Sequence, residues 1–450
     1  MLWKIASILV YTTKPYLATK SREKFEKKPG NPDRMAEYAE ALADYAVALS
    51  RIGYYQPACD VSQKGLELYR PLAPKDLRRF ESAYARSLGV YAVCLSDVGK
   101  NEEAIEYASE SLGIYKRLAQ KNPDLFESNY ATLLSNYAKH LGEMGKDDEA
   151  LEYSHAALDV RKRLAQKNSD RFEPDYAMSL NNYAKHLSDV GQYEEALGHD
   201  REALEICKRL AQKNPDRFEP DYARSLNNYA NHLSDVGKNE EALEYDREAL
   251  EIYKRLAQKN PDRFEPDYAM SLNNYAKHLS DVGQYEEALG HDREALEIRR
   301  RLAQKNPDRF ADDLFSNICF VYFLAWLCDK SDGSDKPDPN QLMTFIAPHR
   351  RSLMLLFSAF VEGCSRTDRA ARHEAFRQVL SHWTNLSKAE KISGEPSWLC
   401  AAAWCAAFEP ATVAESEWKN SWHQFLKQRN GFMPRWMLDV ARRLEFKWPE

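Results

Sequence analysis

Seven asparagines recur at fixed positions in the middle of the chain, and their side chains could bind a polypeptide backbone. A side-chain amide is both a donor and an acceptor, so a row of them can bond an extended peptide whatever its sequence. Lys185, Arg224 and Lys277 flank this row and would attract acidic side chains of a partner. We call the seven residues the amide ladder: Asn181, Asn182, Asn227, Asn228, Asn231, Asn273 and Asn274.

Four histidines form a second regular set: His140, His186, His232 and His278. Zinc needs its ligands within ~2.1 Å of one ion, whereas equivalent atoms of neighbouring helices lie roughly 10 Å apart. We therefore expect these histidines to pack or to hydrogen-bond between helices, and we expect no metal. The eight cysteines form no C-x-x-C pair, so we expect buried free thiols. No nucleotide, hydrolase or kinase motif is present, so we expect neither a cofactor nor enzyme activity.

These residues belong to a 46-residue period. Phe80, Phe126, Phe172, Phe218, Phe264 and Phe310 keep this step, as do Gly53, Gly99, Gly145, Gly191, Gly237 and Gly283. Residues 171–206 return unchanged at 263–298, a shift of 92 residues or two periods. Six units fit between residues 34 and 309. The chain is thus a modular array.

One unit reads as a helical hairpin. Apolar residues at helical spacing predict a first helix over 219–236, which Gly237 ends, and a second over 242–256. Asn260-Pro261 then breaks the second helix, and Asp262 is expected to cap the next one. Ala230 and Ala242 lie on either side of the turn, where two helices must approach closely. Such hairpins bury their apolar faces by stacking, which predicts an all-α solenoid.

The stretch "LNNYANHLSDVGKNEEALEYDREALEI" resembles a tetratricopeptide repeat, most closely the kinesin light chain variety. The resemblance implies a right-handed α-solenoid that binds partners in a trough lined by each first helix, with the "LNN" asparagines as contacts. The clamp for terminal carboxylates of chaperone-binding relatives is not matched, because Asn227 and Asn273 stand where it has a lysine. Asp200, Asp246 and Asp292 also stand where the family usually places an aromatic residue.

The ladder has a second interpretation: its amides are solvated or bond between helices. Units one and two lack it, since Ala43-Asp44 and Gly89-Val90 take its place. If the ladder binds a peptide, the groove should centre on units three to six.

The composition changes at both ends of the array. We expect an N-terminal helix or degenerate half-repeat over 1–33, six repeats over 34–309, a degenerate capping helix and loop over 310–335, and a C-terminal helical domain over 336–450. The apolar stretch 314–329 is interpreted as a buried helix that closes the array, in preference to a membrane helix. Arg366, Arg369, Arg372 and His373 could form a basic stripe for an acidic partner, although most such stripes are solvated faces. Helices are expected near 341–363, 367–388, 397–408, 412–428 and 434–446.

These features predict a non-enzymatic scaffold that binds a protein or peptide partner in a concave groove. The alternative is a sensor–effector, in which the array senses a partner or signal and the C-terminal domain acts. Self-association through the near-identical repeats is a third possibility. The net charge of −6 argues against a nucleic-acid partner. The apolar run at residues 5–10 is too short for a membrane span or export signal, so we expect a cytoplasmic protein.

Overall fold

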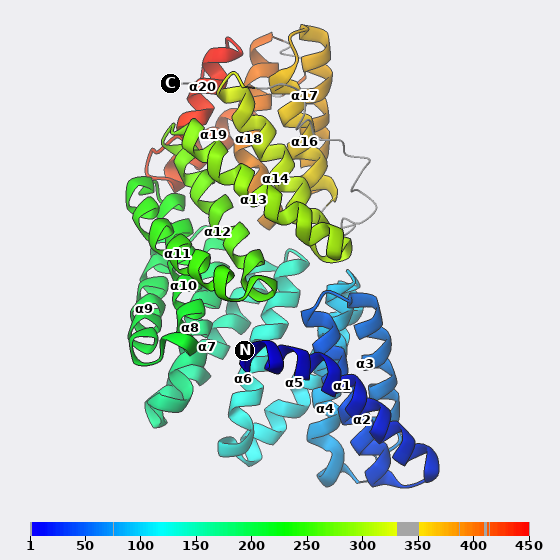
Figure 1. The fold of residues 1–450 in the computed structure, drawn as a ribbon. Helices are drawn as coiled ribbons and strands as arrows, with labels where there is room; N and C mark the ends of the chain where they lie inside the picture. The colour runs from blue at the N-terminus through cyan, green and yellow to red at the C-terminus, as the bar shows by residue number, and fades with distance from the viewer. Residues whose placement is uncertain are drawn as a thin grey trace. The chain divides into compact units, whose positions relative to one another are not determined.

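The computed structural model describes residues 2–74, 76–330, 351–386, 388–408, 412–413 and 415–449. These residues form helices and turns and contain no strand, and successive helix pairs pack as in an all-α solenoid (Figure 1). The chain divides into two compact units, residues 1–172 and 173–450, which are described separately. The start of the helix expected at 341–363 lies outside the described residues.

The first unit contains helices α1 to α7, and most of α8 belongs to the second unit. The bounds in the first unit are α1 (Leu2–Lys27), α2 (Pro32–Arg51), α3 (Tyr55–Tyr69), α4 (Leu77–Asp97), α5 (Asn101–Lys121), α6 (Pro123–Glu143) and α7 (Asp147–Lys167). The repeats of the second unit consist of α8 (Ser169–Asp189), α9 (Tyr193–Lys213), α10 (Pro215–Asp235), α11 (Asn239–Lys259), α12 (Pro261–Asp281), α13 (Tyr285–Lys305) and α14 (Pro307–Leu327). The closing helices are α16 (Arg351–Ser365), α17 (Arg369–Trp383), α18 (Lys388–Phe408), α19 (Glu415–Gln428) and α20 (Arg435–Arg443).

A glycine turns the chain between the two helices of each repeat, as the sequence predicts. The six turn glycines have φ between +71° and +85°, a conformation that costs side-chain-bearing residues energy. Asp329 follows Gly283 by one further period and keeps a positive φ of 55°. Ala230, Ala242 and Ala249 are fully buried, because the paired helices approach closely at these positions.

The start of each first helix differs from our expectation. Asn260, not Asp262, is the N-cap of α12, and Pro261 is its first residue. Proline suits this position because the first turn has no use for its missing N–H group. In the equivalent caps, the side chains of Asn214 and Asn306 accept hydrogen bonds from the backbone N–H groups of Arg217 and Arg309, both at 3.3 Å. Asp262 lies in the first turn instead, where its charge complements the helix dipole.

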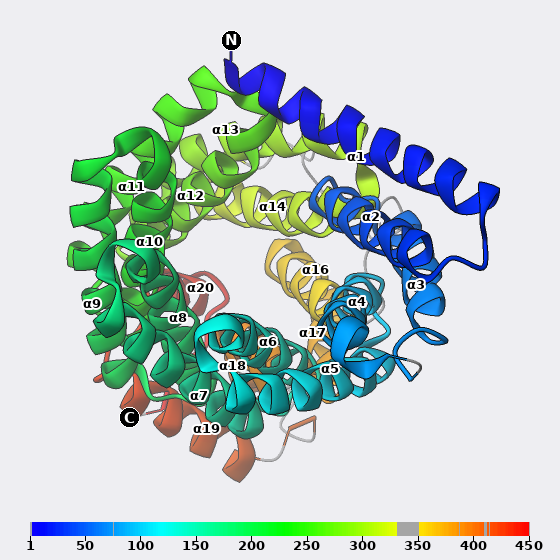
Figure 2. The ribbon, with the colours of Figure 1, turned by 90° about the horizontal axis from the view of Figure 1, so that it is seen from below.

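The repeats of the second unit form two layers. Figure 2 shows the first helices α8, α10, α12 and α14 side by side, with the second helices α9, α11 and α13 packed behind them. We call these the first-helix layer and the second-helix layer. Helix α14 is long and apolar enough to cross a membrane by composition, but 67% of that window is buried inside the fold. Its burial is that of a core helix.

The closing helices pack on α12 and α14. Arg443 donates to the carbonyl oxygens of Trp326 and Leu327 at the end of α14 and pairs with Asp329. Trp418, Trp422 and Phe425 are buried, as expected for core residues. All eight cysteines are free thiols, and seven of them are buried.

The basic stripe is bound within the closing helices. Arg366 pairs with Glu362, Arg372 donates to the Gly363 carbonyl at 3.2 Å, and Arg369 donates to the Phe408 carbonyl at 2.6 Å. Arg366 and Arg369 remain exposed, so binding of an acidic partner by this stripe stays a prediction.

Candidate functional site

Two of the three first asparagines of the "LNN" motifs, Asn181 and Asn227, are buried and join neighbouring repeats, whereas Asn273 is half-buried. The side-chain oxygen of Asn181 accepts a hydrogen bond from the Ser225 hydroxyl at 3.4 Å. Asn227 accepts one from Ser271 at 3.2 Å. This is the inter-helix bonding that the second interpretation of the ladder describes, and it uses the acceptor side of each amide.

Asn273 is held differently, because Asn317 stands where the next repeat would have the serine. The Asn317 amide donates to the backbone oxygen of Asp292 at 3.2 Å. The Asn273 amide nitrogen donates to the Asp292 carboxylate at 2.8 Å, which leaves its own oxygen without that serine partner. Asp292 is fully buried, and burial raises the pKa of its carboxyl group to about 7.

The other four ladder amides remain available. Asn182 is exposed, and Asn228, Asn231 and Asn274 are half-buried. Within the described residues their side chains make no hydrogen bond. The flanking cations also differ in whether they are paired with a carboxylate. Lys185 pairs with Asp189 at 2.6 Å and Arg224 with Asp221 at 2.5 Å, whereas exposed Lys277 has no carboxylate within 4 Å in the described chain.

The histidines pair with the unexpected aspartates. His278 Nδ1 lies 2.6 Å from the Asp246 carboxylate, and His232 contacts Asp200 in the same way. Burial alone would lower the pKa of His232, but its hydrogen bond and charge interaction with Asp200 outweigh burial and raise it. All four histidines are buried, as expected for packed side chains, and two of them also make the expected inter-helix hydrogen bond.

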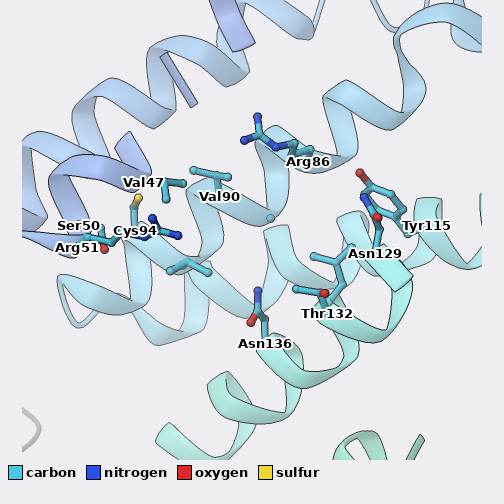
Figure 3. Close-up of a pocket in the computed structure, with 13 residues that line it drawn as sticks. Val47, Ser50, Arg51, Arg86, Val90, Cys94, Tyr115, Asn129, Thr132 and Asn136 are labelled. Carbon is cyan, nitrogen blue, oxygen red and sulfur yellow. The ribbon is translucent and has the colours of Figure 1, made fainter. Parts of the chain in front are cut away.

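A cavity of about 550 Å³ lies on the first helices of the first unit (Figure 3). Val90 and Val93 of α4 form part of its apolar wall, and Arg86 lies beside them. Asn129 and Asn136 of α6 bring amides to the same cavity. We expected a groove centred on units three to six, yet this cavity lies on units one to three.

Three cavities, in both units, lie against the same face of the first helix. Another, of about 650 Å³, lies between the Gly191 turn and the end of α19. Arg86, Gly89, Val90 and Val93 follow the i, i+3, i+4, i+7 pattern of one helix face. Shifted by whole periods, the position of Arg86 becomes Arg224, that of Gly89 becomes Asn181 and Asn273, and that of Val93 becomes Lys277, and these residues also line cavities. Asn181 and Arg224 line one of about 100 Å³, and Asn273 and Lys277 line one of about 240 Å³.

Comparison with protein families decides what the repeats are. The tetratricopeptide repeat model matches residues 129–209, 175–255 and 221–301. Residues 129–301 are therefore built of tetratricopeptide repeats. The comparison with curated protein sequences gives no match.

Solved structures with tetratricopeptide folds resemble the chain at low identity. The apo form of RapI is 16% identical, with a TM-score of 0.55, over 87% of this chain and 99% of that one. A Rap protein complexed with Competence and Sporulation Factor is 15% identical, with a TM-score of 0.52, over 91% and 99%. A putative kinesin light chain with nearly identical repeats from Podosopora anserina is 18% identical, with a TM-score of 0.38, over 48% and 95%. At these identities the likeness shows the fold alone.

The sequence contained signals for contacts that we did not predict. Each Asp–His pair between tetratricopeptide repeats is separated by 32 residues, and each Asn–Ser pair by 44. Ser188 and Ser234 contact Asp235 and Asp281 across 47 residues. Polar residues that recur with one fixed separation near the repeat length are candidates for contacts between adjacent repeats.

Proposed function

We propose that this chain is a protein-interaction scaffold whose tetratricopeptide repeats hold an extended segment of a protein partner along the first-helix layer. One observation carries the proposal: three of the cavities, in both units, lie against one recurring face of the first helices. Available amides from Asn136, Asn182, Asn228 and Asn274 occupy one position of that face, 46 residues apart. Such amides suit a partner backbone better than a specific side chain.

The comparisons support the same role. One of the similar folds is a Rap protein crystallised with Competence and Sporulation Factor, so this architecture accommodates a ligand in that protein. For the present chain, the available amides are the groups that we propose hydrogen-bond the partner backbone.

The test uses peptides selected from a random library on the full-length chain. We expect Asn182→Ala/Asn228→Ala/Asn274→Ala to weaken a selected peptide by at least about tenfold, because three hydrogen bonds are lost at roughly 0.5–1.5 kcal/mol each. The matched control is Lys208→Ala/Lys254→Ala/Arg300→Ala, at exposed positions of the second-helix layer. Equal weakening by both variants, or by neither, contradicts the proposal.

A sensor–effector role is the second candidate, and contacts of the closing helices favour it. Phe432 packs so tightly on Gly237 that a Cβ atom there would lie 2.6 Å from the Phe432 Cβ. Arg435 lies against Gly283, and Arg443 pairs with Asp329. Three successive turns of the array therefore contact one short segment. Under this role a bound peptide changes amide hydrogen exchange in α20, whereas a plain scaffold leaves that exchange unchanged.

A further inference from the structure

The cavity of about 240 Å³ in the second unit has a mixed lining, and of its residues in the six repeats only Asn273 and Lys277 belong to the face that the scaffold role uses. Its walls come from α12, α14, α16 and α18 and from residues 429–436. Phe320, Phe323, Phe357, Phe360 and Trp436 make most of the lining apolar. The volume is below the ~300–1,000 Å³ typical of pockets for drug-sized ligands, so it suits a smaller one.

Most polar groups of this pocket already have partners. The Trp436 indole donates to Asp281 at 3.1 Å, and the Ser234 hydroxyl contacts the other oxygen of that carboxylate at 3.4 Å. Ser280 donates to the Lys277 carbonyl at 2.7 Å. Arg429 lies 3.9 Å from Asp235. The Lys277 ammonium and the Asn273 oxygen are left, and they are one helical turn apart on the same face.

The aromatic wall is specific to this place in the array. The positions of Phe320 and Phe323 are held by Asn228 and Asn231 two periods earlier. Lys185 is the equivalent of Lys277 in the identical stretch 171–206, and it is already paired with Asp189. An unpaired cation beside aromatic side chains therefore occurs at Lys277 and not at Lys185.

We propose that this pocket binds a small carboxylic acid with an aromatic or branched aliphatic body. The carboxylate pairs with the Lys277 ammonium, and the apolar body lies among the phenylalanines. A neighbouring N–H or O–H group of the ligand donates to the Asn273 oxygen. Because the walls come from both the repeats and the closing helices, the bound acid would stabilise their contact. This goes beyond the proposed scaffold role, since the ligand is a small molecule and most of the walls of its pocket come from α14, α16, α18 and residues 429–436.

The test is fluorine NMR of the full-length chain labelled with 5-fluorotryptophan. Loss of one signal in Trp436→Phe assigns the resonance of Trp436. The probes are N-acetyl-L-phenylalanine and N-acetyl-L-phenylalaninamide, which share the apolar body and differ in charge. We expect the acid to shift the Trp436 signal saturably with a millimolar dissociation constant, as its size implies. The amide should bind about fivefold more weakly, the gain expected of a partly exposed ion pair.

Two variants separate the pocket from an indirect effect. Lys277→Met should bring the acid down to the affinity of the amide and leave the amide unchanged. Lys185→Met, at the equivalent position of the identical stretch, should change neither. The absence of a saturable shift, equal affinities for the two probes in the unmodified chain, or a preference that survives Lys277→Met overturns the proposal. A peptide ending in phenylalanine that binds more than about tenfold more tightly than the free acid also overturns it, because the ligand would then be a chain terminus.

Discussion

Residues 171–206 and 263–298 are identical in sequence, yet the structure places them in different surroundings. In the first copy Lys185 pairs with Asp189, and His186 lies 3.6 Å from the same carboxylate. In the second copy Asp281 accepts from Trp436, and His278 bonds Asp246. The differences come from the neighbours. Ser154 stands in the third repeat where later repeats have Asp200 and Asp246. Helix α20 packs on α12 of the second copy, whereas Gln428 of α19 lies beside Gly191 of the first.

The buried aspartate shows the same dependence on neighbours. Asp200 of the first copy has His232 as its partner, whereas Asp292 of the second faces Leu324 at the equivalent position of α14 and bonds Asn273 instead. Thus one sequence gives a charged pair in one place and a lone buried acid in the other. Identical substitutions in the two copies isolate what the neighbours contribute.

The largest difference is expected for His→Phe. His278→Phe leaves the fully buried Asp246 without its partner and should reduce the free energy of unfolding by about 3 kcal/mol. His186→Phe removes only the longer contact with Asp189, at 3.6 Å, and should cost about 1 kcal/mol or less. Urea denaturation of both variants measures the difference. Equal losses would contradict the pairing seen in the second copy.

Asp→Asn should raise the free energy of unfolding in one copy and lower it in the other. Burial raises the pKa of Asp292 from an ordinary value of 3.8 to about 7 in the folded state, so the fold holds a proton that the unfolded chain releases. The stability of the native chain should therefore fall as pH rises from about 4 to about 7 through this group. Asp292→Asn removes that fall and should stabilise the fold by about 2 kcal/mol at pH 7.5.

Asp200→Asn breaks the pair with His232 and should destabilise the fold by a similar amount. Thermal denaturation at pH 5 and pH 7.5 compares the variants with the native chain. A pH dependence that persists in Asp292→Asn would place its origin elsewhere.

The next largest difference in stability is expected for the aspartates that end α12 and α8, Asp281 and Asp189. Asp281→Ala loses the charged hydrogen bond from Trp436 and should cost about 1.5–2 kcal/mol, with faster amide hydrogen exchange in α20. Asp189→Ala loses the exposed Lys185 pair and should cost about 0.5 kcal/mol, with no change in α20. Exchange measured by mass spectrometry reports both effects. Protection of α20 that survives Asp281→Ala would show that this bond does not hold it.

The smallest effect concerns the lysines. Lys185→Met should lower stability by about 0.3–0.5 kcal/mol, the value of an i,i+4 pair. Lys277→Met should leave stability unchanged, because Lys277 has no carboxylate partner among the described residues. Paired thermal melts at low and at 0.5 M salt check this, since screening should remove the cost in Lys185→Met. A larger loss of stability in Lys277→Met than in Lys185→Met would contradict this prediction.

The helical hairpins could be predicted from the sequence because they depend on local patterns. Gly237 and its equivalents mark the turns, and Ala230 and Ala242 mark the close approaches. The use of the ladder could not be predicted, because it depends on the following repeat. Asn227 and Asn273 have the same neighbours in sequence, but one meets Ser271 and the other Asn317. The aromatic pocket depends on segments more than 150 residues apart, such as Asp281 and Trp436, which no period connects.

The identity of the two stretches makes the length of the array adjustable. Removal of residues 207–298 would join Ile206 to Arg299. The 36 residues before Arg299 would keep their present sequence, because residues 171–206 are identical to 263–298. Lys185 would then stand beside α14 in the place of Lys277. A gene encoding such a chain can lose or gain two repeats by recombination between the copies, and α14 and α20 would still meet the residues that α12 now presents to them, because residues 171–189 repeat 263–281.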